Sequence, residues 1–291
     1  MFFDRKTKKT APGVKNVEAA PCRKAERKVK QLFTYSYTHM GNRQYQQDSV
    51  FVSESKTLAA NKKIRVLEVV CDGMGGMADG GRAARTGTII MKEDFMKIEK
   101  EQDVDIPSFL ENEVRKIDQV IAQFPQENGH GSGSTIVAVI AEDNYLYWVS
   151  VGDSRIYILR GDEMRQKTRD HNYLLRLSEM VANGEMSLEE AKQQPQKEAL
   201  ISFLGIGGLE LIDISPTPVE LIPGDIVLLC SDGVTKTLED DWIKKIMQSP
   251  TSSMEEKAET LVRAAVRRNT RSQDNTSVAI LHYDYKSIGS R

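Results

Sequence analysis

The chain has 291 residues, of which 40% are apolar, and its formal net charge is −2. This length suits one large domain or two small ones, and the near-zero charge gives no general attraction to nucleic acid or anionic membranes. No run approaches the roughly 20 apolar residues that span a membrane, and no signal peptide is recognisable at the start. Three widely spaced cysteines, Cys22, Cys71 and Cys230, argue against a disulfide framework or a zinc site, so we expect a cytoplasmic protein.

The first 30 residues differ from the rest in charge. They hold ten Lys and Arg against three Asp and Glu, a net charge of +7, which leaves −9 for the remainder. Charge-rich segments without apolar periodicity seldom fold. We therefore expect residues 1–30 to be a basic, disordered tail, with a docking arm as the alternative, and the catalytic domain to span residues 31–285.

Strand-like segments begin directly after this tail. They are short, rich in β-branched or aromatic residues, and bounded by turn residues. Three of them lie close together between residues 135 and 159 and are interpreted as an antiparallel meander. The predicted strands are Leu32–Thr38, Ser49–Ser53, Ile64–Cys71, Thr135–Ala141, Tyr145–Val151, Arg155–Leu159, Ile226–Cys230 and Ser277–Tyr283.

Three longer helices are predicted between these strands. Asp105–Phe124 places its apolar side chains on one stripe, and Pro107 suits its first turn. Arg82–Glu99 follows a glycine-rich turn. A third helix, Glu255–Arg268, begins after Ser252 or Ser253, either of which is a favourable N-cap.

Residues 171–205 are polar and carry few large apolar side chains. We expect them to form a surface insertion with short helices at Asn172–Asn183 and Leu188–Gln194. Together, antiparallel strands with helices interspersed indicate an α+β sandwich of sheets with helical outer layers, rather than a parallel doubly wound sheet.

Four aspartates adjoin buried strands. Asp72, Asp232 and Asp274 lie directly after or near such strands, and Asp48 precedes another. Each alone can be a turn residue, since Asp and Gly are common in turns. Four converging carboxylates would repel one another unless a cation neutralised them, and hard oxygen ligands suit Mg²⁺ or Mn²⁺ better than zinc.

The glycines after Asp72 favour a ligand over a turn residue. Gly73, Gly75 and Gly76 follow it and permit close backbone approach, so that the Gly73 carbonyl can face a metal. The segment lacks the Lys-Ser/Thr of a nucleotide-binding P-loop.

Seven stretches of the chain stand out, in this order: GNRQYQQDS, VVCDGMGGMADGGRAA, GSGSTIVAVI, YWVSVGDSRIYILRGDEM, TRDHNYL, PGDIVLLCSDGVTKTL and SQDNTSVAI. Together they resemble the type-2C, metal-dependent protein phosphatases, particularly the bacterial ones. The resemblance runs from about residue 32 to residue 284. It implies a four-layer α-β-β-α sandwich of two antiparallel sheets, with residues 171–205 as a helical flap.

The resemblance also implies a set of metal ligands. Asp72 is similar to the carboxylate that bridges two metals, with the Gly73 carbonyl on one of them. Asp232 and Asp274 resemble ligands of the other metal, and Asp48 the residue that binds the second metal or its waters.

Three further residues are assigned by the same resemblance. Arg43 looks like the residue that grips the substrate phosphate, which suits a planar guanidinium that can bind two oxygens at once. Asp153 looks like a ligand of a third, weaker metal, and Asn275 is similar to the asparagine beside the last metal ligand.

The implied function is hydrolysis of phosphoserine and phosphothreonine in proteins. The attacking water bridges two Mn²⁺ or Mg²⁺ ions. The expected partners are a Ser/Thr kinase and its phosphorylated substrates, and we expect a monomer. A catalytically weak regulatory or binding module of the same fold is the alternative. A third possibility is a phosphatase of anti-sigma-factor antagonists, but the sensor domains common in those enzymes are not visible here.

Several positions depart from the family pattern. Gln46 stands where Asn is usual, and Lys236 stands where bacterial relatives often carry an Asp that shares the third metal with Asp153. We therefore predict two tightly held ions and a weak or absent third. Met74 replaces the His of some relatives. His171 has no paired ligand or nucleophile in the sequence and is expected to be structural. Residues 202–205 read Ser-Phe-Leu-Gly, so the flap can select substrates differently.

Overall fold

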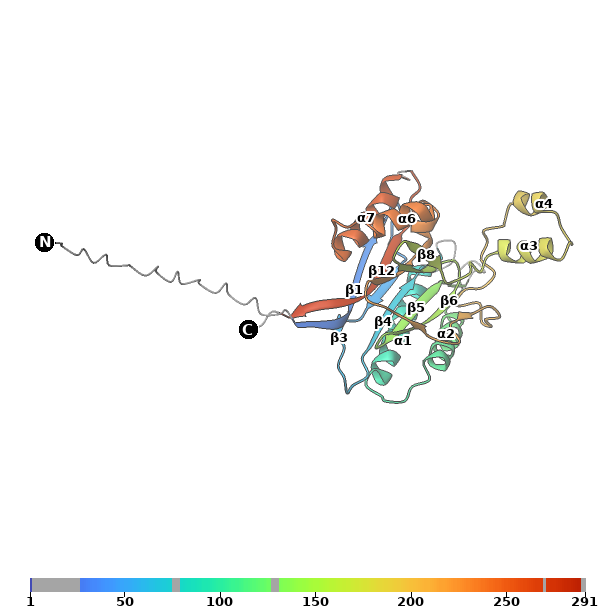
Figure 1. The fold of residues 1–291 in the computed structure, drawn as a ribbon. Coiled ribbons are helices and arrows are strands. Elements are labelled where there is room, and N and C mark those ends of the chain that lie inside the picture. The colour runs from blue at the N-terminus through green and yellow to red at the C-terminus, as the bar shows by residue number, and fades with distance from the viewer. Residues whose placement is uncertain (2–26, 75–78, 127–130, 269–270, 289–291) are drawn as a thin grey trace.

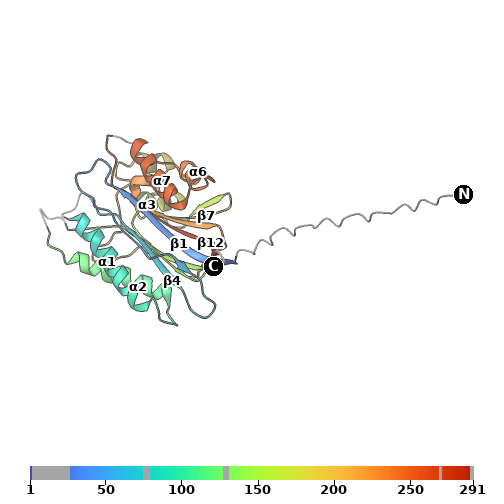
Figure 2. The same ribbon diagram turned by 90° about the vertical axis from the view of Figure 1, so that its left-hand side faces the viewer.

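The computed structural model describes Met1 and residues 27–74, 79–126, 131–268 and 271–288. Two antiparallel sheets lie face to face, with helices on both outer faces (Figures 1 and 2). The predicted α+β four-layer sandwich is confirmed. None of the helices in the described segments is long and apolar enough to cross a membrane.

The first sheet contains both the first and the last strand of the described chain. Its strands follow the order β3-β1-β12-β11-β7-β8, and every neighbouring pair is antiparallel. Arg27–His39 pairs with Thr276–Ile288 over its whole length. The strands are β1 (Arg27–His39), β3 (Lys56–Thr57), β7 (Arg155–Arg160), β8 (Glu163–Gln166), β11 (Asp225–Cys230) and β12 (Thr276–Ile288).

The second sheet is built around two largely buried strands. Its order is β10-β6-β5-β4-β2, with β9 also paired to β6. The central strands β4 and β5 bury nearly every residue, because they are covered on both faces. The strands are β2 (Ser49–Val52), β4 (Arg65–Cys71), β5 (Ile136–Glu142), β6 (Tyr145–Val151), β9 (Asp213–Ile214) and β10 (Val219–Glu220).

The described residues form three hydrophobic cores: one between the sheets and one under the helices on each outer face. Strand β4 contributes side chains to two of them. Val66 and Val70 point into the core between the sheets, whereas Leu67 and Val69 point outward, because successive side chains of a strand face opposite sides. Helices α1 (Gly80–Ile98) and α2 (Ile106–Ala122) cover that outer face.

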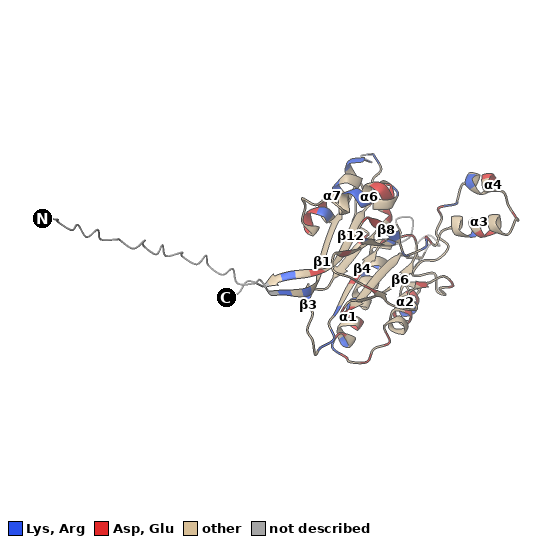
Figure 3. Ribbon diagram, in the orientation of Figure 1, with Lys and Arg blue, Asp and Glu red and all other residues tan. Residues whose placement is uncertain are grey.

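The other sheet is covered by helices from the C-terminal part of the chain. These are α5 (Asp232–Thr235), α6 (Asp240–Met247) and α7 (Met254–Arg268). Helix α7 begins with a reciprocal cap, in which Ser253 Oγ accepts from the Glu256 N–H (3.2 Å) and the Glu256 carboxylate accepts from the Ser253 N–H (2.8 Å). Acidic and basic residues are interleaved on these helices (Figure 3), which indicates an ordinary solvated outer face.

The insertion forms the expected pair of short helices. Helix α3 (Tyr173–Ala182) and helix α4 (Leu188–Gln193) stand away from the sandwich in Figure 1. Leu177 and Ala191 are buried, which gives the pair a small core of its own. The two legs of the insertion are joined by hydrogen bonds, such as that from the Tyr173 N–H to the Ala199 carbonyl (2.8 Å).

 The insertion is therefore a compact unit held at its base.

Two sequence-based expectations are wrong, and several short elements were not predicted. The meander is wrong in its last step: β5 pairs with β6, but β7 lies in the other sheet, because the chain crosses between the sheets at Gly152, whose φ is +107°. The tail boundary is also wrong, since residues 27–30 belong to β1; residues 2–26 lie outside the described residues. The short elements α5, α6, β3, β8, β9 and β10 were not expected from the sequence.

Candidate functional site

The five aspartates named from the sequence lie at one end of the sandwich. Each adjoins the end of a strand, and antiparallel pairing brings these strand ends together. Asp72 follows β4, Asp232 follows β11 and Asp153 follows β6. Asp48 precedes β2, and Asp274 precedes β12.

Asp72 is held in place by its backbone. Its carbonyl accepts from the Thr135 N–H (2.8 Å) and from Ser134 Oγ (2.9 Å), and its N–H donates to Thr135 Oγ1 (3.1 Å). Burial, together with the neighbouring carboxylates of Asp232 and Asp48, raises the pKa of Asp72 well above its ordinary value. The side chain is therefore fixed where a negative charge is costly.

Gly73 occupies a position with no room for a side chain. A Cβ there would lie 2.3 Å from the Gly80 carbonyl oxygen and 2.6 Å from the Gln47 carbonyl oxygen. The close approach of three backbone segments thus explains this glycine. Gly75 and Gly76, which the sequence analysis also used, lie outside the described residues.

Asp48 is the most enclosed of the carboxylates, with 7% of its surface exposed. Its Oδ2 accepts from Ser231 Oγ (2.9 Å), and its backbone N–H donates to Gln46 Oε1 (3.2 Å). Burial raises the pKa of Asp48 to about 7, and the charge of Asp232 adds to this effect. Gln46, a departure from the family pattern, thus supports the backbone at Asp48.

Asn275 organises the loop that carries Arg43. Its amide donates to the carbonyls of Met40 (2.8 Å) and Tyr45 (3.1 Å), and its Oδ1 accepts from the Gln47 N–H (2.7 Å). The side chain is only 3% exposed. Sequence reasoning named Asn275 only as a neighbour of a ligand, whereas the contacts show that it positions the Arg43 loop.

Arg43 reaches the carboxylate end from this loop. Its Nη2 lies 2.6 Å from Asp274 Oδ2, and about half of its side chain is exposed. Asp274 raises the pKa of Arg43 through this hydrogen bond, although the guanidinium is charged at any physiological pH without it. Arg43 is thus a fixed positive charge beside the aspartates and open to solvent.

Lys236 stands on the other side of the cluster. Its ammonium contacts the Asp232 carboxylate and lies 3.7 Å from Asp153 Oδ2. Burial lowers the pKa of Lys236, but the nearby carboxylates, Asp232 first, outweigh burial and raise it. Burial raises the pKa of Asp153 to about 6, Asp232 adds to this, and Lys236 opposes it.

Gly233 allows this arrangement around Asp232. A Cβ at Gly233 would lie 2.1 Å from the Asn275 carbonyl oxygen, so the Asp274–Asn275 backbone passes directly over it. Helix α5 begins at Asp232, with Ser231 as its N-cap residue. One short segment therefore supplies Ser231, which contacts Asp48, and the carboxylate of Asp232.

The carboxylates gather without forming a closed ligand set. In the part of the chain that the structure describes, no three His, Cys, Asp or Glu side chains lie close enough together to hold a metal ion. Arg43 and Lys236 instead contact two of the carboxylates. However, Asp48 Oδ1 and Asp232 Oδ1 are buried and have no hydrogen-bond partner among the described residues.

These two carboxylate oxygens test whether the site suits a divalent cation. A buried carboxylate oxygen without a donor requires a proton or a cation. The available donors are carboxylate and carbonyl oxygens, which are the ligands that Mg²⁺ and Mn²⁺ prefer. The residues present therefore fit such ions.

His171 lies behind the turn that carries Asp153. The residue is fully buried. Its Nδ1 accepts from the Gly152 N–H (3.2 Å), and its backbone N–H donates to the Gly152 carbonyl (2.9 Å). Its Nε2 lies 3.4 Å from Asp213 Oδ1. These contacts fix the backbone before Asp153 and agree with the structural role expected for this histidine.

The chain is similar to known proteins over most of its length. The profile of the protein phosphatase 2C family matches residues 36–268. The serine/threonine phosphatase stp of Listeria innocua is 30% identical over 235 residues, which cover 79% of this chain and 89% of that protein.

Solved structures share the fold. The Mycobacterium tuberculosis serine/threonine phosphatase PstP/Ppp is 27% identical, with a TM-score of 0.68, over 87% of this chain and 99% of that one. The catalytic domain of the phosphatase PstP in complex with two manganese ions is 27% identical, with a TM-score of 0.66, over 88% of this chain and 99% of that one. These similarities cover most of the chain rather than one motif.

Proposed function

This chain belongs to the protein phosphatase 2C family and is a protein serine/threonine phosphatase, and from that premise we propose how its site works. We propose that it hydrolyses phosphoserine and phosphothreonine in proteins with two Mn²⁺ or Mg²⁺ ions. Asp48, Asp72, Asp232 and Asp274, with the Gly73 carbonyl, would hold these ions. The observation that carries the proposal is that one buried oxygen of Asp48 and one of Asp232, where the strand ends meet, have no hydrogen-bond partner in the described part of the chain.

The bound ions would supply the electrostatic part of the chemistry. They lower the pKa of water so that it is a nucleophile near neutral pH, and they neutralise charge on the phosphoryl group. The chain contributes a rigid frame for this chemistry, because every carboxylate is fixed at the end of a strand.

Arg43 would bind the substrate phosphate. It is half exposed on a loop that Asn275 holds by three hydrogen bonds, so its backbone position is fixed while its side chain can reorient. The guanidinium would exchange Asp274 for two phosphate oxygens, a geometry that arginine matches with both arms of its fork. Asn275 is a positioning residue for this step.

A cysteine-based mechanism does not fit the described cysteines. Cys71 and Cys230 are fully buried under the outer helices, and burial raises the pKa of each thiol to about 12. The thiolate is the nucleophilic form, so these residues would be inert near neutral pH. This supports attack by water.

Lys236 would limit the site to two tightly held ions. Its ammonium lies between Asp232 and Asp153, where a third ion would need the same carboxylates. A cation already there opposes binding of another. Asp153 would then serve mainly to hold Lys236, and a third ion would bind weakly or not at all.

The decisive experiment measures phosphate release from a phosphothreonine peptide and from p-nitrophenyl phosphate. We expect activity that requires Mn²⁺ or Mg²⁺ and that falls by roughly a thousandfold in Asp72→Ala. Circular dichroism would check that the variant is folded. Absence of activity with every divalent ion tested would favour the alternative, a regulatory module that keeps the fold.

The biological role that we propose is opposition to a Ser/Thr kinase in signalling. The names of similar proteins, including the protein phosphatase PhpP of Streptococcus pneumoniae, support protein substrates. The kinase of the same cell, phosphorylated in vitro, is the substrate to test first. Failure to dephosphorylate it while peptides are hydrolysed would contradict this part of the proposal.

A further inference from the structure

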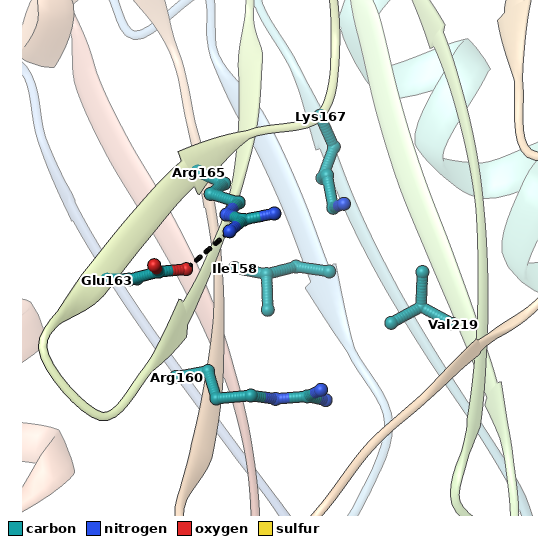
Figure 4. Close-up of a pocket in the computed structure, with 6 residues that line it drawn as sticks. All are labelled: Ile158, Arg160, Glu163, Arg165, Lys167 and Val219. Atoms are coloured by element: carbon teal, nitrogen blue, oxygen red, sulfur yellow. Dashed lines mark hydrogen bonds and ion pairs between the residues drawn. The ribbon is translucent and has the colours of Figure 1, made fainter.

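A hollow lies on the side of the sandwich, away from the aspartates. It has a volume of about 260 Å³ and lies between the edge of the first sheet and strand β10 of the second. Figure 4 shows its lining: Ile158, Arg160, Glu163, Arg165, Lys167 and Val219. Apolar side chains thus meet a group of mostly basic ones.

The charges arise from the alternation of side chains along β8. Met164 packs into the outer core beneath helices α6 and α7. Glu163 and Arg165 alternate with Met164 and line the hollow between the sheets, and Lys167 follows in the same phase. Neighbouring strands fill that space with apolar side chains such as Ile158.

Two of the three basic groups remain available to a ligand. Arg160 is committed, because its Nη2 lies 2.6 Å from the buried Asp225 carboxylate. Arg165 pairs with Glu163 at 2.6 Å, but both side chains are about two-thirds exposed, so this pair is weak. The Lys167 ammonium lies 5.8 Å from the centre of the Trp148 ring and forms no ion pair within the described segments.

Strand β8 also offers a free backbone edge. It is the last strand of its sheet, and in the described chain it pairs only with β7. Inward-pointing charges on an edge strand oppose pairing with an apolar strand. The same charges favour an added strand that places acidic side chains opposite them.

A neighbouring hollow beside β8 has the opposite charge balance, although Glu163 and Arg165 border both hollows. That hollow is lined by four acidic side chains, two basic ones and a methionine: Asp162, Glu163, Asp240, Asp241, Arg165, Lys244 and Met164. An added strand with acidic residues on both faces would be repelled on this side. Acidic residues at alternate positions are therefore the best match.

We propose that the β8 edge docks an extended segment of a protein substrate in which alternate residues are acidic, with their carboxylates facing Arg165 and Lys167. The acidic character of the chain beyond its first 30 residues makes this local basic group a distinctive target for such a segment. The role in substrate binding rests on the proposed function. Strand β7 runs from the Asp153 turn to the hollow, so the two sites lie roughly 15–20 Å apart, within reach of a short peptide.

Direct binding tests the docking site without reference to catalysis. Fluorescence anisotropy of the full chain would use a labelled hexapeptide of alternating Glu and Thr, with alternating Gln and Thr as the neutral probe. We expect Arg165→Glu with Lys167→Glu to weaken binding of the acidic probe on the order of tenfold. The exposed pair Lys28→Glu with Lys286→Glu, on β1 and β12, is the charge-matched control and should bind as the wild type does.

Kinetics would then separate docking from chemistry. On a phosphothreonine peptide carrying the acidic segment, the β8 double variant should raise KM with kcat unchanged, and it should leave p-nitrophenyl phosphate hydrolysis unaltered. Equal binding of the acidic and neutral probes, or equal loss in both double variants, would overturn the docking proposal. Acidic-probe binding that depends on Arg165 and Lys167 in a protein without phosphatase activity would support docking and reject the proposed function.

Discussion

The two ends of the sandwich differ in how far their carboxylates are neutralised by basic side chains. At one end Asp48, Asp72 and Asp232 converge, and oxygens of two of them lack partners within the described chain. At the other end Glu142 is bound by Arg65 and Lys63, at 2.5 and 2.9 Å. Arg65 itself is fully buried and also donates to the Ile98 carbonyl at 2.8 Å.

Strand β11 has one aspartate of each kind near its two ends: one that is neutralised and one that belongs to the cluster. It begins at Asp225, which Arg160 holds, and Asp232 follows its other end. Both aspartates are positioned by the same strand. The difference shows that a strand end alone does not make a site: the site arises where the carboxylates outnumber the groups that neutralise them.

The largest expected effect comes from replacing, one at a time, Asp225 at the start of β11 and Asp232 just after its end. Asp232→Asn should lower phosphatase activity by roughly a thousandfold, because it removes a charge that would hold an ion. Asp225→Asn should retain activity within a few-fold, because it lies at the opposite end. Initial rates with saturating Mn²⁺ decide this, and comparable losses in both variants would break the contrast between the ends.

The next effect concerns stability at the opposite end. Glu142→Gln should lower the free energy of unfolding by about 3 kcal/mol, because it leaves the buried Arg65 without its counter-charge. Urea unfolding would measure this. Lys63→Met is the matched control: its side chain is 40% exposed, so its loss should cost less than about 1 kcal/mol.

Glu68 adds a carboxyl that belongs to neither end. It is fully buried in β4, both of its oxygens lack partners in the described chain, and burial raises its pKa well above the ordinary 4.5. The folded state therefore holds a proton that the unfolded state has released, so stability falls as the pH rises above about 4.5 toward the folded pKa. Glu68→Leu should gain about 2 kcal/mol at pH 8 and lose this pH dependence.

Chemical unfolding across the pH range would test this sign. Glu68→Gln is the control, since it removes the titration but keeps a buried polar group, and it should gain less. A wild type that becomes more stable as the pH rises from 5 to 8, with the same slope in both variants, would refute the assignment.

The smallest expected effect sharpens the account of the aspartate end. Replacing Lys236 by a carboxylate, Lys236→Asp, should strengthen a third Mn²⁺ site by roughly tenfold or more, because an ammonium beside Asp153 becomes a ligand. Isothermal titration would count the ions. A third site in the wild type with an affinity comparable to the first two would refute the role given to Lys236.

Much of the fold follows from local patterns. The run at Ile64–Cys71 predicts a buried strand, and the apolar stripe of Asp105–Phe124 predicts a helix, because both patterns have the period of their structure. The predicted hairpin at Gly152 is wrong, because a short connection between two strands is compatible with a hairpin or with a crossing between sheets. Short elements such as α5 and β8 carry too few residues to show a period.

The sequence by itself determined the sandwich class, its main strands and helices, and the aspartates that border them, because hydrophobic period and turn chemistry are local properties. Only the tertiary structure decided which groups meet. It placed Arg43 on Asp274, 231 residues away, Lys236 beside Asp153, and Asn275 under the Arg43 loop. Such contacts depend on strand order and register, which fix distances that no local pattern specifies.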